Sequence, residues 1–258
     1  MARTSLKFES TALTDVGCVR QLNEDSYLDR PEICLWAIAD GMGGHEAGDL
    51  ASGLLVQALA EVQPSDSGYG FLDEVHASVQ RVNRTLIARA AVMRPGTVIG
   101  STIVILLAYA GHYACLWAGD SRAYILRGAR LEQITRDHSV VQELIDTGAL
   151  TRTDAKSYKK QNVITRAVGV TTSLSLDMHQ GPIEPGDRFL LCSDGLTGMI
   201  DDEEIRRFLS TDVHQAAAEG MLSTALSRGA KDNVTLIVVE AAESPEDTLR
   251  QTGDWTRV

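Results

Sequence analysis

The sequence lacks the features that would place it in a membrane or on nucleic acid. Its longest apolar run, Ile103 to Ala110, is far too short to span a bilayer, and Met1 to Ser10 lacks the hydrophobic core of a signal peptide. Its net charge of −11 leaves no basic excess for sequence-blind nucleic-acid binding. We therefore expect a cytoplasmic protein with no membrane insertion and no nucleic-acid partner.

Cysteines are few and widely separated. No two of the four form a CxxC pair, which argues against a zinc site. Cys34, Cys115 and Cys192 lie within or beside apolar runs, whereas Cys18 does not. Buried free thiols in a reducing compartment explain this placement better than disulfides do.

The composition is that of a globular chain with an excess of acid. Apolar residues make up 44% of the 258 residues, which is enough to form a core in one large domain or two small ones. The acidic excess fits a protein that holds cations through oxygen ligands. It also fits the plainer interpretation that acidic side chains keep a cytosolic protein soluble.

Apolar periodicity predicts strands interrupted by pairs of helices. Strand-like runs occupy residues 33–39, 98–108, 111–118, 121–127, 188–192 and 234–239, and helical patterns occupy 45–62, 72–93, 139–147, 201–210 and 213–228. The breaks at Ala110-Gly111 and Gly119-Asp120 are too short for a parallel crossover, so the strands they join must be antiparallel. The order predicts an α+β domain rather than a doubly wound parallel sheet.

Acidic residues recur where the predicted strands begin or end. The set is Asp40, Asp120, Asp194, Asp232 and the pair Glu24-Asp25. Glycine beside most of these aspartates lets the backbone approach closely, so a carbonyl oxygen can also serve as a ligand. A single Asp-Gly usually marks a turn, and the spacing alone leaves open whether the carboxylates meet in space.

Carboxylates that converge would need cations. Two like charges ~4 Å apart repel each other by about 4 kcal/mol at an effective dielectric constant near 20. Ligands made only of oxygen favour Mg²⁺ or Mn²⁺ over zinc or copper, and a pair of such ions ~3.5–4 Å apart can activate water for in-line attack on phosphorus. A positive group must also hold the phosphate, and Arg20 is the best candidate.

An ordered set of motifs resembles a known family. The motifs are Thr14-Asp15-Val16-Gly17 with Arg20, Asn23-Glu24-Asp25-Ser26, Ala39-Asp40-Gly41-Met42-Gly43-Gly44, Gly100-Ser101-Thr102, Gly119-Asp120-Ser121-Arg122, Ser193-Asp194-Gly195-Leu196 and Asp232-Asn233-Val234-Thr235. Each is weak alone, but the ordered set, spanning about residues 9–241, is highly specific. It resembles the type 2C metal-dependent protein phosphatases, in their compact bacterial branch.

The resemblance implies a four-layer α/β/β/α sandwich of two antiparallel sheets flanked by helices. Residues 1–242 would form a single catalytic domain, and the polar stretch 243–258 would be a flexible tail. The stretch of about 138–166, which contains the Lys-rich segment 151–162, would correspond to the family's variable flap.

The resemblance also implies which residues would hold metal ions. Asp40 would bridge two Mn²⁺ or Mg²⁺ ions, and the carbonyl of Gly41 would bind one of them. Asp194 and Asp232 would hold the other ion. Asp120, together with Asp194, would form a weaker third site.

Four further residues receive supporting roles from the same resemblance. Arg20 would bind the substrate phosphate, and Glu24 and Asp25 would act on the metals through water or directly. Asn233 would orient its neighbours.

The sequence departs from the family at one position. Many eukaryotic relatives carry a histidine directly after the Asp-Gly, where it protonates the leaving group, but this chain has Met42. His45 lies close by and is one candidate for that role, and a metal-bound water is another. His138 opens the flap and is a candidate for substrate contact.

The resemblance implies a phosphatase of serine and threonine residues in proteins. A hydroxide bridging two metals would attack the phosphorus in line, and the enzyme would act as a monomer that reverses a bacterial Ser/Thr kinase on that kinase and its targets. Two other functions stay open. One is an inactive phosphatase-like docking module, and the other is a phosphoesterase for small molecules on the same fold.

Overall fold

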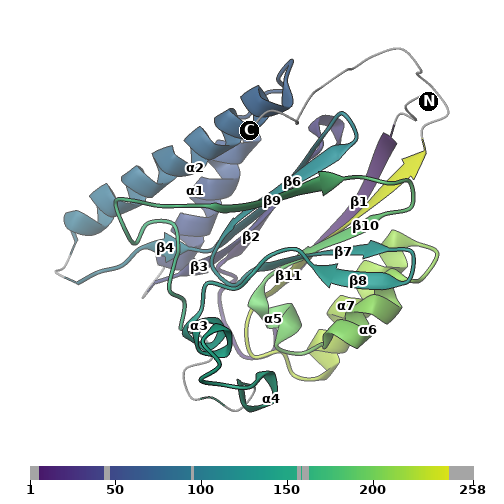
Figure 1. Cartoon of the computed structure of the whole chain (residues 1–258). Helices are drawn as coiled ribbons and strands as arrows, with labels where there is room; N and C mark the ends of the chain where they lie inside the picture. Colours follow the sequence, from purple (N-terminus) through teal and green to yellow (C-terminus); the bar gives the residue numbers. More distant parts are fainter. Residues whose placement is uncertain (1–5, 44–46, 94–95, 156–157, 159–162, 244–258) are drawn as a thin grey trace.

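The computed structural model describes residues 6–43, 47–93, 96–155, 158 and 163–243, which form two stacked antiparallel sheets with helices outside them (Figure 1). The five-stranded sheet has the order β1 (Leu6–Asp15), β11 (Val234–Glu243), β10 (Arg188–Cys192), β7 (Arg122–Arg127) and β8 (Arg130–Gln133). The other sheet has the order β2 (Asp25–Arg30), β3 (Leu35–Met42), β5 (Ile103–Tyr109), β6 (His112–Ala118) and β9 (Asp177–Pro182), with β4 (Gly100–Ser101) paired to β3.

Helices cover the two outer faces of the sandwich. Figure 1 shows α1 (Ala47–Ala60) and α2 (Gly68–Ala91) on one side and α5 (Asp194–Thr197), α6 (Asp202–Leu209) and α7 (His214–Ser227) on the other. A short 3-10 helix, Pro31–Ile33, joins β2 to β3, and the small helices α3 (Val140–Asp146) and α4 (Arg152–Ala155) lie between β8 and β9. This is the four-layer α+β architecture that the sequence predicts.

Three apolar layers separate the four layers of secondary structure. In β3, Leu35 and Ala37 face the helices α1 and α2, whereas Trp36 and Ile38 face the opposite sheet. Strand β11 alternates in the same way between the inter-sheet core and the layer beneath α6 and α7. Because both faces of these central strands are buried, their sequences are continuously apolar rather than alternating.

Local signals set the turns and helix starts. Ala110 and Gly111 both have positive φ, 50° and 78°, as the two central residues of the tight β5–β6 hairpin require. Helix α6 begins with a capping box, in which Asp201 accepts from the Glu204 N–H and the Glu204 carboxylate accepts from the Asp201 N–H. Both devices satisfy backbone groups that would otherwise lack partners.

Several predicted boundaries differ from those in the structure. The strand predicted at residues 33–39 runs from Leu35 to Met42, because Asp40 pairs with Asp25 on one side and Gly41 pairs with Ser101 on the other. The segment 151–162 contains α4, and 156–157 and 159–162 lie outside the described residues. Of the predicted tail, Glu243 ends β11, and 244–258 lie outside the described residues. No helix in the described part of the chain is both long enough and apolar enough to cross a membrane.

Replacing Leu191 with alanine tests the inter-sheet core. Leu191 lies in β10 with no exposed surface, so Leu191→Ala leaves a cavity and is expected to lower the free energy of unfolding by about 2–5 kcal/mol. Urea denaturation followed by circular dichroism measures the change. Val92→Ala is the control, because Val92 is 86% exposed and its truncation should change stability by less than about 0.5 kcal/mol. Equal effects of the two substitutions would contradict this description of the core.

Candidate active site

Carboxylates from both sheets lie at one end of the sandwich. Asp25 begins β2 and stands directly opposite Asp40 near the end of β3, in the pairing of these two antiparallel strands. Asp120 lies in the turn between β6 and β7, Asp194 follows the end of β10, and Asp232 precedes β11. The antiparallel pairing of β10 with both β7 and β11 brings these strand ends together.

Buried hydroxyl groups hold the Asp40 backbone in place. The Asp40 N–H donates to the Thr102 hydroxyl at 3.1 Å, and the Asp40 carbonyl accepts from the Thr102 N–H at 2.8 Å and from the Ser101 hydroxyl at 2.9 Å. The Thr102 hydroxyl also lies 2.7 Å from that of Ser121, next to Asp120. The motif Gly100-Ser101-Thr102 therefore supports two carboxylate-bearing segments at once, a role that the sequence did not reveal.

Ser193 joins the two sheets at the acidic end. Its hydroxyl donates to Oδ2 of Asp25 at 2.8 Å and accepts from the Thr235 N–H at 3.1 Å. Ser193 is fully buried and directly precedes Asp194. The position of Asp25 is thereby tied to the strand end that carries Asp194.

Two glycines of the motifs stand where no side chain fits. A Cβ at Gly41 would overlap the carbonyl of Gly48, and a Cβ at Gly119, where φ is +120°, would lie 2.5 Å from the Cβ of Thr102. The Gly41 N–H donates to the carbonyl of Glu24 at 3.1 Å, so Glu24 lies against the end of β3. Glycine is required at both positions by close approach, and at Gly119 also by its backbone conformation.

Asn233 fastens the loop that carries Arg20 and Glu24. Its side-chain oxygen accepts from the Glu24 N–H at 2.9 Å, and its side-chain nitrogen donates to the carbonyls of Val16 and Leu22, each at 3.0 Å. Only 5% of Asn233 is exposed. The loop between β1 and β2 is therefore held against the start of β11.

Arg20 and Asp232 pair with each other at the edge of this cluster. Nη2 of Arg20 lies 2.8 Å from Oδ2 of Asp232, and the Asn233 N–H donates to the other carboxylate oxygen at 2.9 Å. Half of the Arg20 side chain is exposed. An exposed pair of this kind contributes little to stability, which leaves Arg20 able to exchange its partner.

Burial and mutual repulsion raise the pKa values of the clustered carboxyl groups. Burial raises the pKa of Asp25 and of Asp194 to about 6 and that of Asp120 to about 7, and in each case a neighbouring aspartate adds to the shift. The pKa of Asp40 lies well above its usual value, first because of burial and then because of Asp25, Asp194, Asp120 and Asp232. Protein groups alone do not fully compensate this negative charge.

The donor set fits hard divalent cations. Carboxylate oxygens predominate, and their raised pKa values show that an added positive charge would be favourable here. Among the described residues, no three histidine, cysteine or acidic side chains are close enough together as they stand to hold an ion. In this arrangement Asp232, one of the predicted ligands, is paired with Arg20. The ligand assignments for Asp40, Asp194, Asp232 and their neighbours stay predictions.

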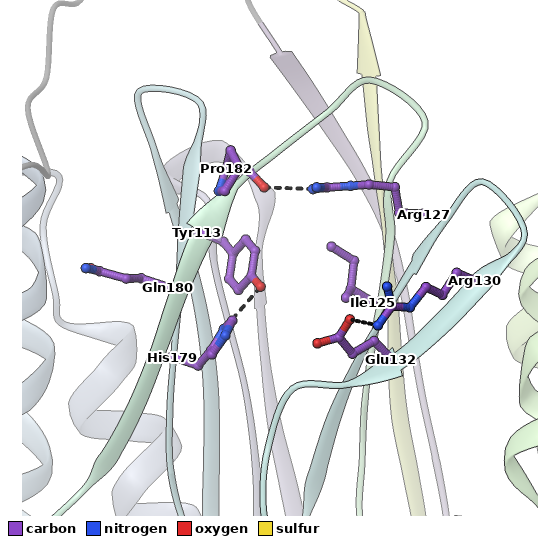
Figure 2. Close-up of a pocket in the computed structure, with 9 residues that line it drawn as sticks. Tyr113, Ile125, Arg127, Arg130, Glu132, His179, Gln180 and Pro182 are labelled. Carbon is purple, nitrogen blue, oxygen red and sulfur yellow. Dashed lines mark hydrogen bonds and ion pairs between the residues drawn. The ribbon is translucent and has the colours of Figure 1, made fainter.

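A second concave region lies away from this cluster. A cavity of about 410 Å³ is lined by residues of β6, β7, β8 and β9. Figure 2 shows the side chains that line it. Three pairs form among its lining residues: Tyr113 with His179, Arg130 with Glu132, and Arg127 with the carbonyl of Pro182. None of the predicted site residues lines this cavity.

Of the three residues that the sequence singles out around the general acid and the flap, the structure describes two. Met42 ends β3 and is half-buried, and His45 lies outside the described residues. His138, the candidate for substrate contact, is 9% exposed, so its ring is buried rather than presented to solvent.

A two-sheet sandwich with aspartates at its strand ends defines the class of the molecule. A family model described as protein phosphatase 2C matches residues 19–231. The chain therefore belongs to the protein phosphatase 2C family, as its motifs indicate.

Relatives with known names agree with this assignment. The chain is 36% identical over 244 residues to the serine/threonine protein phosphatase PstP of Mycobacterium tuberculosis, an alignment that covers 94% of this chain and 47% of PstP. The chain thus spans about half the length of that relative. It is 33% identical over 235 residues to the serine/threonine phosphatase stp of Listeria monocytogenes, with 88% of this chain and 93% of that protein covered.

Solved structures share the fold. PppA, described as a key regulatory component of T6SS in Pseudomonas aeruginosa, superposes with a TM-score of 0.85 at 42% identity, over 92% of this chain and 99% of that one. The catalytic domain of PstP in complex with two manganese ions superposes with a TM-score of 0.83 at 35% identity, over 93% of this chain and 100% of that one.

The raised pKa values predict that the metal-free protein loses stability as pH rises. Asp120 stays protonated in the folded chain up to about pH 7, whereas in the unfolded chain it ionises near its usual pKa of about 4. Its contribution to the free energy of unfolding is therefore complete below about pH 4 and is lost as pH rises through about 7. Asp120→Asn removes this titration.

The test compares the unsubstituted chain with Asp120→Asn, both in a chelator that removes metal ions. The unfolding free energy of each protein is measured in EDTA by urea denaturation at pH 5 and at pH 8. The value for Asp120→Asn minus that for the unsubstituted chain should increase by at least about 1 kcal/mol from pH 5 to pH 8. Added Mn²⁺ should stabilise the unsubstituted chain more at pH 8 than at pH 5, because metal and protons compete for the carboxylates. Parallel pH profiles of the two proteins in EDTA would show that Asp120 is not crowded as described.

Proposed function

We propose that this chain is a metal-dependent phosphatase that removes phosphate from serine and threonine side chains of proteins. The observation that carries the proposal is the cluster of aspartates with raised pKa values beside Arg20, at the end of the sandwich where the family's motifs meet. Names of relatives such as PstP and stp support a serine/threonine phosphatase activity. A manganese-bound structure of a relative supports a divalent cofactor, Mn²⁺ or Mg²⁺.

The residues divide into those that would hold metal and those that would hold phosphate. Asp40, the carbonyl of Gly41, Asp194 and Asp232 would hold two cations, with Asp120 at a weaker third position. When bound, such ions lower the pKa of water and offset the charge of the phosphate. Glu24 and Asp25 would assist from the adjoining loop and strand.

Arg20 would bind the phosphate of the substrate. Its guanidinium group is exposed and already lies beside an oxyanion, the Asp232 carboxylate. A phosphate monoester also presents two oxygens to the planar guanidinium group, and it carries more negative charge than a carboxylate. Arg20 would therefore orient the phosphate group of the substrate beside the carboxylate cluster.

Attack by water fits the thiols of this chain better than a covalent cysteine intermediate. Burial raises the pKa of Cys34 to about 11 and that of Cys192 to about 12, and it also raises the pKa of Cys115. Cys18 is exposed, but no glycine-rich turn ending in arginine follows it. A reactive thiolate needs a lowered pKa.

The substrates would be phosphorylated proteins. We infer a role in reversing a Ser/Thr kinase, acting on the kinase and its targets, since the named relatives are serine/threonine phosphatases. The single domain at 1–242, the monomeric state and the cytoplasmic location remain predictions from the sequence.

Hydrolysis of a phosphothreonine peptide tests the function. Turnover should require Mn²⁺ or Mg²⁺, stop in EDTA and fall by at least about 100-fold in Asp194→Asn, because a charged ligand becomes a neutral one. Asp73→Asn, which changes an exposed carboxylate on α2, is the matched control and should keep full activity. No turnover by folded protein with any divalent metal would favour the docking module. Faster turnover of nucleotide or sugar phosphates would favour the small-molecule phosphoesterase.

Substitution of Arg20 separates phosphate binding from structure. Arg20→Ala should raise KM for the phosphopeptide by about 10- to 100-fold, and Arg20→Lys should restore only part of the loss, since lysine cannot make two parallel hydrogen bonds. The midpoint of thermal unfolding should stay nearly unchanged, because the pair with Asp232 is exposed. Arg84→Ala on α2 serves as the control. A large loss of stability with KM unchanged would assign Arg20 a structural role instead.

A further inference from the structure

His138 is a buried histidine that contacts the turn between β6 and β7, which carries Asp120, on one side and β9 on the other. Its Nδ1 accepts from the Gly119 N–H at 3.1 Å, and its Nε2 lies 3.3 Å from Oδ2 of Asp177 at the start of β9. The ring stacks on Trp117, with centroids 6.1 Å apart and planes inclined by 15°. Few rotations are open to a side chain held in this way.

The backbone of His138 reinforces the same contacts. Its N–H donates to the carbonyl of Gly119 at 2.9 Å, so residue 138 engages both polar groups of Gly119. Its carbonyl accepts from the Thr165 N–H at 2.8 Å, which joins the first residue of the flap to its returning end. His138 thus stands where the flap, residues 138–166, meets the turn that carries Asp120.

The contact with Gly119 fixes the protonation of the ring. Because Nδ1 accepts a hydrogen bond, the proton of the neutral imidazole must lie on Nε2. Burial lowers the pKa of His138, which favours this neutral form, and the contact with Asp177 opposes the shift. The Nε2 atom is near Asp177 without the alignment of a hydrogen bond, and no other described residue provides it with one.

Gly119 has little freedom to move independently. Its φ of +120° and its contact with Thr102 exclude a side chain, and the next residue is Asp120, of which only 8% is exposed. A displacement of the Gly119 peptide would therefore displace the Asp120 carboxylate.

We propose that His138 is a positioning residue, which fixes Asp120 through the Nδ1 contact with Gly119 and thereby couples the flap to the weaker metal position. This inference rests on the proposed function, because it assigns Asp120 to a cation. It concerns how the carboxylate is held and requires no contact of His138 with substrate or metal.

Two substitutions test the polar contacts of the ring separately, because each removes one contact and keeps the other. In His138→Asn, the amide oxygen takes the place of Nδ1 and can still accept from Gly119, but the side chain no longer reaches Asp177. In His138→Gln, the amide nitrogen takes the place of Nε2 and can reach Asp177, but nothing accepts from Gly119. Both lose the stacking on Trp117, so each variant is the control for the other.

Amide hydrogen exchange and Mn²⁺ binding to the full chain provide the readouts. In His138→Gln, the Gly119 N–H should exchange about tenfold faster, and calorimetry should show the weakest Mn²⁺ site bound about five- to tenfold less tightly, consistent with one lost hydrogen bond. His138→Asn should stay within about threefold of the unsubstituted chain in both measurements. Equal behaviour of the two variants would overturn the proposal and leave His138 as a packing residue against Trp117.

The unsubstituted protein provides a test that does not depend on either variant folding. Nitrogen NMR of the imidazole should show Nδ1 unprotonated and Nε2 protonated, with a scalar coupling across the Gly119 N–H to Nδ1 hydrogen bond. A proton on Nδ1 would overturn the proposal. These readouts need no turnover, so a failure of the phosphatase assay would count against the proposed function without altering the result for His138.

Discussion

Repulsion among carboxylates at one end of the sandwich is the constraint on which the rest of the site depends. Asp25, Asp40, Asp120 and Asp194 come from strand ends of both sheets. Burial raises the pKa of each carboxyl group, and repulsion by a neighbouring aspartate raises it further. The free energy that holds them together must come from elsewhere in the fold. The three apolar layers supply it, because the central strands bury side chains on both faces. The unfavourable free energy of the carboxylate cluster is thus offset by the burial of apolar side chains in the core.

Neutral side chains, rather than cations, fix most of the charged segments. Thr102 and Ser101 hold the backbone of Asp40, Ser193 donates to Asp25, and Asn233 holds the loop that carries Glu24. Hydroxyl and amide groups position a carboxylate without neutralising it, so its affinity for an added cation is preserved. A lysine in the same places would have supplied the charge permanently and removed the reason to bind metal.

The sequence predicts the strong periodic elements and the motif residues, but not what depends on distant partners. Strands β3, β5, β6, β10 and β11 were predicted because their runs are apolar on both faces. Strand β1, with alternating exposure, and strand β9, which is polar and half exposed, were not, because their pairing with β11 and β6 rather than their composition makes them strands. In the same way, the aspartates were predicted as candidates from motifs, whereas the roles of Thr102, Ser193 and His138 follow from contacts with residues 19 to 168 positions away.

The guanidinium groups of Arg122 and Arg20 both act to lower the pKa of Asp194. Their surroundings differ, and so does their freedom to move. Arg122 makes two-pronged contacts with Asp137, whose side chain is 10% exposed, and Arg122 also donates to the Tyr124 hydroxyl. Moving Arg122 would leave the largely buried Asp137 carboxylate without its counter-charge, at a cost of several kcal/mol. Arg20 is half exposed and pairs with a partly exposed partner, Asp232, so its release costs little. Arg122 therefore acts as a fixed counter-charge for Asp194, whereas Arg20 is the cation that, in the function we propose, would transfer from the Asp232 carboxylate to the phosphate of a substrate.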